Sequence, residues 1–197
     1  MTSNFYTIER EGKGIYKEKM SKFLSFALPV STAEEAKIKI KDFQNEYHDA
    51  RHVCWAYMLG KDRKEWQLND NGEPSGTAGK PILGQINSFG LTDVLVVVVR
   101  YFGGIKLGTP GLIAAYREAA RLALEDGGKI EKHSMAQYII HFPYMAASGV
   151  MKILKSSEAV IVDQVFDNTC SITFKIREDH SEKITGQLGS LSGISFS

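Results

Sequence analysis

The chain has 197 residues, of which 43% are apolar and 24% charged, and its formal net charge is +1. This balance is typical of a chain that folds around a hydrophobic core, and a charge near zero argues against a protein that coats nucleic acid indiscriminately. Its two cysteines lie far apart without a Cys-x-x-Cys motif, which argues against a disulfide framework and a thiolate metal site. We therefore expect no metal and no cofactor, and any RNA contact has to be local.

The chain shows no segment suited to a membrane. The apolar run from Val94 to Val99 is far shorter than the roughly 20 residues that span a bilayer. The first six residues, Met1 to Tyr6, lack the basic segment and apolar stretch of a signal peptide. We expect a cytoplasmic protein without membrane contacts.

The first part of the chain alternates predicted strands with one helix. Apolar patterning predicts strands over residues 5–10 and 15–28, and Ser31 or Thr32 can cap a helix that ends near His48. Strands follow over residues 53–58 and 66–68. His48 and His52 are four residues apart, but the change from helix to strand between them breaks the geometry of a metal pair.

Two glycine-rich loops then flank one apolar strand. The strand, residues 91–99, is apolar on both parities, as expected of a strand covered on both faces. Each loop precedes a predicted helix, and Pro81 suits the first turn of the helix after the first loop. Helix N-termini favour anions, so we expect one shared anion-facing surface. Its predicted contacts are Arg100, Tyr101, Gly103, Gly104, Lys106, Ser75, Thr77 and Lys80.

Neither loop matches a nucleotide-binding fingerprint. The phosphate loop of nucleotide hydrolases needs Ser or Thr after Gly-Lys, where this chain has Pro81. The stretch from Gly103 to Gly108 does not fit Gly-x-Gly-x-x-Gly. Nucleotide hydrolysis and dinucleotide binding are therefore not expected.

The last part of the chain has its own pattern of elements. Strands are predicted over residues 136–142, 159–166, 169–176 and 194–196, and helices over residues 145–154 and 180–191. This β-α-β-β-α-β order is that of a ferredoxin-like unit. We expect two domains, residues 1–132 and residues 133–197.

The two loops resemble the signature of the Impact family. The matching stretches are Glu73-Pro74-Ser75-Gly76-Thr77-Ala78-Gly79, Arg100-Tyr101-Phe102-Gly103-Gly104-Ile105-Lys106-Leu107-Gly108 and Arg51-His52-x-Cys54-Trp55-Ala56-Tyr57. The chain resembles the bacterial two-domain members, often called the YigZ type. The resemblance implies an α+β fold, with a first domain similar to domain IV of elongation factor G and a ferredoxin-like second domain similar to its domain V. The family often has two acidic residues where this chain has Asp70-Asn71, so no carboxylate metal pair is expected there.

The resemblance implies a non-enzymatic, RNA- or ribosome-binding protein that regulates translation. In this reading Arg100 supplies a bidentate fork for phosphate, Lys106 and Lys80 supply point charges, and Tyr101 or Phe102 stacks on a base.

Two other functions stay open, an enzyme or binder of a small phosphorylated metabolite at the same loops and a protein-interaction module using the ferredoxin-like sheet. For the enzyme, Glu73 could act as a base and Ser75 or Thr77 as a nucleophile, but the sequence places no His or Asp to activate them. We therefore assign no catalytic residue, and the sequence leaves the oligomeric state open.

Overall fold

The computed structural model describes residues 4–167 and 169–197, and within them the chain forms two compact units. One unit comprises residues 5–132, and the other comprises residues 133–197 together with Asn4. Residues 1–3, which belong to the expected first domain and to the segment read for a signal peptide, lie outside the described residues. Both units combine helices with antiparallel sheets, so the chain is α+β.

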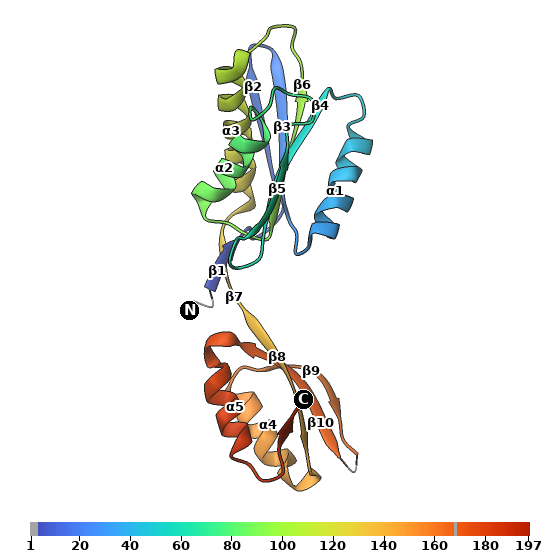
Figure 1. The fold of residues 1–197 in the computed structure, drawn as a ribbon, viewed down its shortest axis with the longest axis vertical. Helices are drawn as coiled ribbons and strands as arrows, with labels where there is room; N and C mark the ends of the chain where they lie inside the picture. Colours follow the sequence, from blue (N-terminus) through green and yellow to red (C-terminus); the bar gives the residue numbers. More distant parts are fainter. Residues whose placement is uncertain (1–3, 168) are drawn as a thin grey trace. The chain divides into compact units, whose positions relative to one another are not determined.

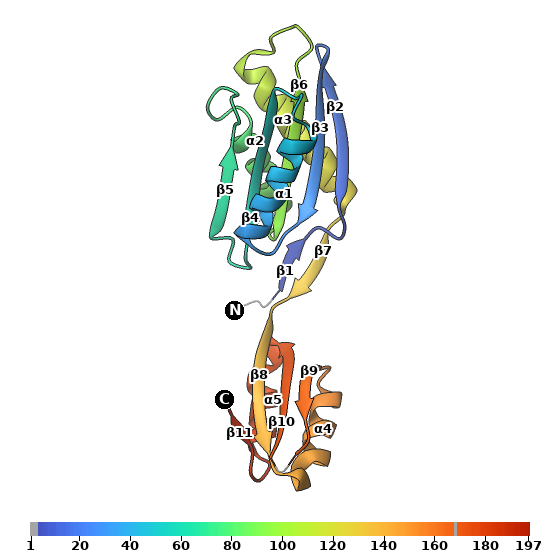
Figure 2. The ribbon, with the colours of Figure 1, turned by 90° about the vertical axis from the view of Figure 1, so that its right-hand side faces the viewer.

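A five-stranded antiparallel sheet organises the first unit, with the strand order β2-β3-β6-β4-β5 (Figure 2). The strands are β2 (Gly12–Glu18), β3 (Ser21–Pro29), β4 (His52–Leu59), β5 (Glu65–Asn69) and β6 (Val94–Tyr101). A separate two-stranded sheet pairs β1 (Asn4–Thr7) with β7 (Ile130–His133). The first strand is thus shorter than the sequence pattern predicts.

Helices cover both faces of the five-stranded sheet, α2 (Gly79–Phe89) and α3 (Gly108–Gly127) on one face and α1 (Ala33–Glu46) on the other (Figure 1). The central strand β6 explains this arrangement. Val94, Val96 and Val98 pack into the core beneath α2 and α3. The alternate residues Leu95, Val97 and Val99 pack into the core beneath α1. Because successive strand residues point to opposite faces, a strand apolar on both parities needs cover on both sides, and the prediction for this strand is confirmed.

Local signals set the helix ends. The hydroxyl of Thr32 accepts a hydrogen bond from the backbone N–H of Glu35 (3.1 Å) and caps α1. Pro81 lies in the first turn of α2, as predicted, and α2 ends at Gly90 in the left-handed conformation. The positions of these helix ends therefore follow from capping and backbone preferences of residues that can be read in the sequence.

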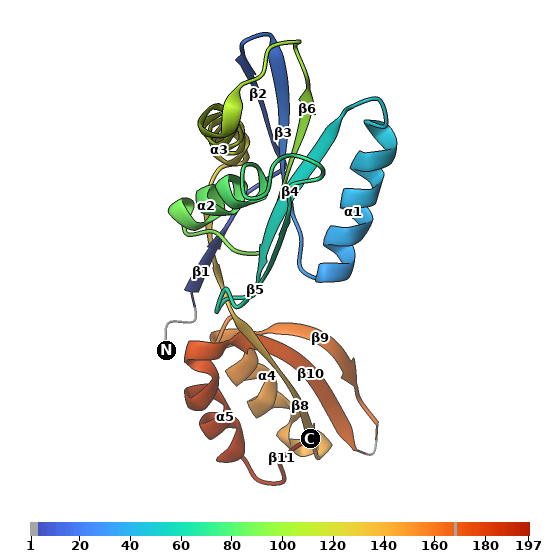
Figure 3. The same cartoon turned by 45° about the horizontal axis from the view of Figure 1, so that its top comes forward.

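The second unit follows the predicted β-α-β-β-α-β order. Its elements are β8 (Met135–Phe142), a 3₁₀ turn (Tyr144–Ala146), α4 (Ala147–Ser156), β9 (Val160–Val165), β10 (Cys170–Arg177), a 3₁₀ turn (Glu178–His180), α5 (Ser181–Gly189) and β11 (Ser195–Phe196). The sheet order is β11-β8-β10-β9, and α4 and α5 lie on one of its faces (Figure 3). In the described ranges of the chain, no helix is long and apolar enough to cross a membrane.

Candidate anion-binding site

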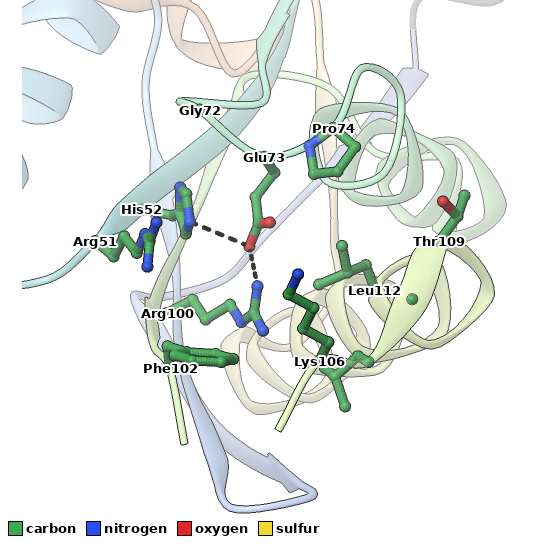
Figure 4. A pocket seen from close by; sticks show the side chains of 12 residues that line it. Arg51, His52, Gly72, Glu73, Pro74, Arg100, Phe102, Lys106, Thr109 and Leu112 are labelled. Carbon is green, nitrogen blue, oxygen red and sulfur yellow. Dashed lines mark hydrogen bonds and ion pairs between the residues drawn. The ribbon is translucent and has the colours of Figure 1, made fainter. Parts of the chain in front are cut away.

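A pocket of about 490 Å³ lies between the two glycine-rich loops of the first unit (Figure 4). Four segments meet there: the start of β4, the first loop, the end of β6, and the second loop with the N-terminus of α3. The pairing of β4 with β6 places His52 directly opposite Arg100. The strand register therefore brings together residues that are far apart in the sequence.

A buried ion pair forms the floor of the pocket. Nη1 of Arg100 lies 2.6 Å from Oε1 of Glu73, and both side chains are almost fully buried. The guanidinium lies between the rings of Phe23 and Phe102, 5.5 Å from each centroid. Arg100, predicted as a fork for phosphate, thus already holds a carboxylate. Its Nε–H is buried and donates to no residue in the described part of the chain.

Two further buried groups complete this cluster. The hydroxyl of Tyr116 donates to Oε1 of Glu73 (2.8 Å), and the thiol of Cys54 lies 3.3 Å from that hydroxyl and donates to the carbonyl of Asp70 (3.0 Å). Burial raises the pKa of Cys54 to about 12, and burial together with Cys54 and Glu73 raises the pKa of Tyr116. Both groups therefore stay protonated at neutral pH, and Cys54 is not poised as a nucleophile.

His52 belongs to the same site, and sequence reasoning missed it there. Its Nδ1 lies 2.8 Å from the carbonyl of Asn71, which fixes the proton on Nδ1. Its Nε2 lies 3.9 Å from Oε1 of Glu73 (Figure 4). The sequence placed no histidine beside Glu73, and the fold brings His52 there. The sequence held one signal that His52 belongs to the site: Arg51-His52 lies in a stretch that resembles the family pattern.

The first loop is closed by its own carboxylate. Asp70 accepts hydrogen bonds from the backbone N–H groups of Gly76 (2.8 Å), Ala78 (3.0 Å) and Gly79 (2.8 Å). These N–H groups at the start of α2 are already satisfied by an anion of the protein itself. The expectation that they face a ligand is corrected.

The three predicted side chains of the first loop do not line the pocket. Thr77 is buried and its hydroxyl donates to the carbonyl of Pro74 (2.6 Å), whereas Ser75 is exposed. Lys80 is exposed and lines a separate recess with Arg117. The single surface expected for both loops is thus divided, and anion binding by Lys80 stays a prediction.

The second loop supplies the mouth of the pocket. Lys106 and Arg51 are exposed there, and neither makes an ion pair within the residues that the structure describes. Gly108 and Thr109 begin α3, whose N-terminus has no side-chain cap. Phe102 is 41% exposed beside them. Unlike the first loop, this helix start leaves its N–H groups available to an anion.

The remaining predicted residues lie next to the pocket. Tyr101 is half-buried, and its hydroxyl donates to Asp49 (2.9 Å). Gly103 packs against the turn between β2 and β3, where a Cβ atom would come within 2.0 Å of the carbonyl carbon of Met20. Gly104 adopts a φ of +89° in open space. Gly103 therefore serves close packing, and Gly104 serves the bend of the loop.

The titratable side chains at this pocket are few. Over residues 4–167 and 169–197, no group of three or more His, Cys, Asp or Glu side chains could hold a metal ion. What the pocket offers is a cationic mouth above a floor with one buried carboxylate.

Comparisons with known proteins identify the family. A family model described as the Impact N-terminal domain matches residues 19–124. The IMPACT family member YigZ of Escherichia coli strain K12 is 35% identical over 147 residues, which cover 74% of this chain and 72% of that protein. The IMPACT family member YvyE of Bacillus subtilis strain 168 is 38% identical over 135 residues, which cover 68% of this chain and 62% of that protein.

Two further comparisons cover more of the chain. An IMPACT family member of Haemophilus influenzae is 33% identical over 175 residues, which cover 86% of this chain and 84% of that protein. A crystal structure described only as that of a hypothetical protein superposes with a TM-score of 0.77 at 26% identity, over 100% of this chain and 97% of that one. The family model and these relatives agree, and the chain belongs to the Impact family.

Proposed function

We propose that this protein is a non-enzymatic RNA- or ribosome-binding protein that regulates translation in the cytoplasm. One observation carries the proposal: two exposed cations, Arg51 and Lys106, and the uncapped N-terminus of α3 surround one pocket mouth beside an exposed aromatic ring, Phe102. Cations with helix N–H groups bind phosphate, and an exposed ring stacks on an unpaired base.

The charges of the pocket favour one placement of the RNA. At the floor, the charges of Arg100 and Glu73 already neutralise one another, so the free cations for a phosphate are those at the mouth, Arg51 and Lys106. The base then lies toward Phe102, whose ring already faces the guanidinium of Arg100 (5.5 Å). In this arrangement Arg100 is a positioning residue that holds Phe102 and Glu73 in place.

The resemblance of the sequence to the Impact family implies a likeness to elongation factor G, and this likeness supports the ribosome as the partner. A first unit similar to domain IV of elongation factor G and a second unit similar to its domain V would both come from the ribosome-contacting half of that factor. The β11-β8-β10-β9 sheet with two helices on one face is compatible with this reading of the second unit.

A binder of a small phosphorylated metabolite is the competing proposal. The volume of about 490 Å³ falls in the range of about 300–1,000 Å³ that small-molecule sites occupy. Glu73 and His52 also give the pocket a polar floor. A thermal-shift screen with nucleotides and sugar phosphates separates the two proposals, because a clear shift with one metabolite and no RNA binding would favour the metabolite.

The RNA proposal is tested by filter binding of ribosomes and of a labelled single-stranded RNA across a range of salt concentrations. Arg51→Ala/Lys106→Ala should weaken binding and reduce the salt slope by about 0.7, the value for the one phosphate that the two cations share on a single strand. The matched control, Lys37→Ala/Lys41→Ala on the exposed face of α1, removes the same charge away from the pocket. Equal affinity and slope in the pocket variant and wild type would refute the proposal.

A further inference from the structure

The turn between β2 and β3 has an unfavourable backbone for its residues. Lys19 and Met20 form the two-residue connection, with φ values of +42° and +66°. Hairpins whose two turn residues both have positive φ strongly prefer Asn-Gly, because a side chain with a Cβ atom is strained there. Met20 is also 80% exposed. Lys and Met are therefore not the residues that would stabilise this turn best.

A second unfavourable feature lies directly beside the turn. Lys17 on β2 and Lys22 on β3 are exposed and directly opposite one another in the strand register. Like charges at directly opposed positions destabilise a hairpin. Glu18 does not neutralise them, since it points to the other face of the sheet and accepts a hydrogen bond from Tyr16 (3.0 Å). An anion bound between the two lysines would replace their mutual repulsion by two attractive contacts.

The two lysines belong to a row that crosses the end of the sheet. Lys17 lies opposite Lys22, and Lys22 lies opposite Tyr101 on β6. The neighbouring strand, β4, begins at His52, opposite Arg100, and Arg51 precedes it at this same end of the sheet. Lys17, Lys22 and Tyr101 point to the face that α1 covers, whereas Arg100 points to the other face, into the pocket. Asp49, which accepts the hydrogen bond of Tyr101 (2.9 Å), is the acidic neighbour of this row. Two inter-strand spacings of about 4.8 Å give the row from Lys17 to Tyr101 a length of about 10 Å.

The row and the turn are joined rigidly to the pocket. Arg51 lines the pocket mouth and lies at the end of the sheet that carries the row. The backbone N–H of Gly103 donates to the hydroxyl of Ser21 (3.2 Å), and the missing side chain of Gly103 lets its backbone pack on Met20. The turn therefore has a defined position beside the second loop, as a preformed binding surface requires.

We infer that the end of the sheet is a second RNA-contact surface. A single-stranded RNA that leaves the pocket passes Arg51 and continues over Lys22 to Lys17. Lys17 and Lys22 hold a phosphate between them, and Met20 packs against a base. A single RNA strand fits because its phosphates match the lysine pair and its bases match the exposed methionine. The inference rests on the proposed function and extends it from one pocket to a track.

Removing the lysine pair tests the track. Lys17→Ala/Lys22→Ala should weaken binding of a labelled single-stranded RNA and reduce the salt slope by about 0.7, the value for the one phosphate that the two lysines share. Its midpoint of thermal unfolding should be unchanged or higher, because the cross-strand repulsion is gone. Lys37→Ala/Lys41→Ala serves again as the control for lost charge. Binding equal to that of the wild type would overturn the inference.

Relieving the strained turn tests the role of Met20. Lys19→Asn/Met20→Gly should raise the midpoint of thermal unfolding by about 4 °C and yet weaken RNA binding. Glu158→Gly is the matched control, since it relieves a positive φ (+55°) at an exposed residue of the second unit and should leave binding unchanged. Full affinity in the turn variant would overturn the assignment of Met20 to the RNA.

The pocket variant, measured in parallel, distinguishes the two proposals. If wild-type protein binds RNA and only Arg51→Ala/Lys106→Ala loses affinity, the track fails and the proposed function stands. If the wild-type protein binds neither RNA nor ribosomes, the proposed function fails and the track fails with it.

Discussion

The buried pair of Arg100 and Glu73 should be a stability element as well as part of the site. Its atoms lie 2.6 Å apart, and the two side chains are only 6% and 3% exposed, so solvent does not screen the interaction. Removing one partner leaves the other charge buried, which typically costs about 3–5 kcal/mol. We therefore expect Arg100→Met to lower the free energy of unfolding of this unit by that amount and its midpoint of thermal unfolding by about 10–20 °C.

The second substitution tests the cause. In Glu73→Gln/Arg100→Met no buried charge is left, and the amide can still accept the hydrogen bond of Tyr116. The double variant should therefore be more stable than the sum of the single effects predicts, by about 2 kcal/mol. Arg117→Met, at an exposed position of α3, controls for the loss of an arginine and should change stability by less than about 0.5 kcal/mol.

The chain offers a selective assay for this experiment. Its two tryptophans, Trp55 on β4 and Trp66 on β5, both lie in residues 5–132. Urea unfolding followed by tryptophan fluorescence thus reports on the unit that holds the pair. Additive effects of the two substitutions, or a loss below about 1 kcal/mol in Arg100→Met, would refute the reasoning.

Three further outcomes follow from single contacts. Asp70→Ala should lower stability by about 2–4 kcal/mol in the same assay, because three backbone N–H groups lose their charged acceptor, whereas Asp70→Asn should cost less. Gly103→Ala should cost about 1–3 kcal/mol through the clash with the backbone of Met20, while Gly84→Ala, in open space on α2, should be neutral or stabilising; equal effects would contradict the packing argument. Cys54, with a pKa of about 12, should resist iodoacetamide at pH 8 in the folded protein and react after unfolding in urea, as peptide mass mapping would show; rapid labelling of the native protein would count against its burial.

Several elements were predictable because their causes are local. The strand of residues 94–99 is apolar on both parities, and it lies between two layers of helices. Thr32 caps a helix and Pro81 lies in the first turn of another, as their side-chain and backbone preferences predict. The β-α-β-β-α-β order of the second unit likewise follows from the periodicity of its segments. The family signature was visible in the same way, as contiguous runs of residues.

The composition of the site was not predictable from the chain alone. Asp70 is the first residue of the first loop, and only the folded loop directs its carboxylate to the N–H groups at the start of α2. Arg100 follows a buried strand and reads as a free cation, but Glu73 is 27 residues away in the chain and 2.6 Å away in space. A charge next to a buried strand can face solvent or a partner, and the sequence does not say which.

The sequence by itself determined which segments form strands and helices, because periodicity and capping are properties of neighbouring residues. Only the tertiary structure decided which side chains meet. The register of β4, β6, β3 and β2 sets His52 opposite Arg100 and aligns Tyr101, Lys22 and Lys17 in one row. Register depends on contacts across the whole sheet, and a shift by one residue would turn every one of these side chains to the other face.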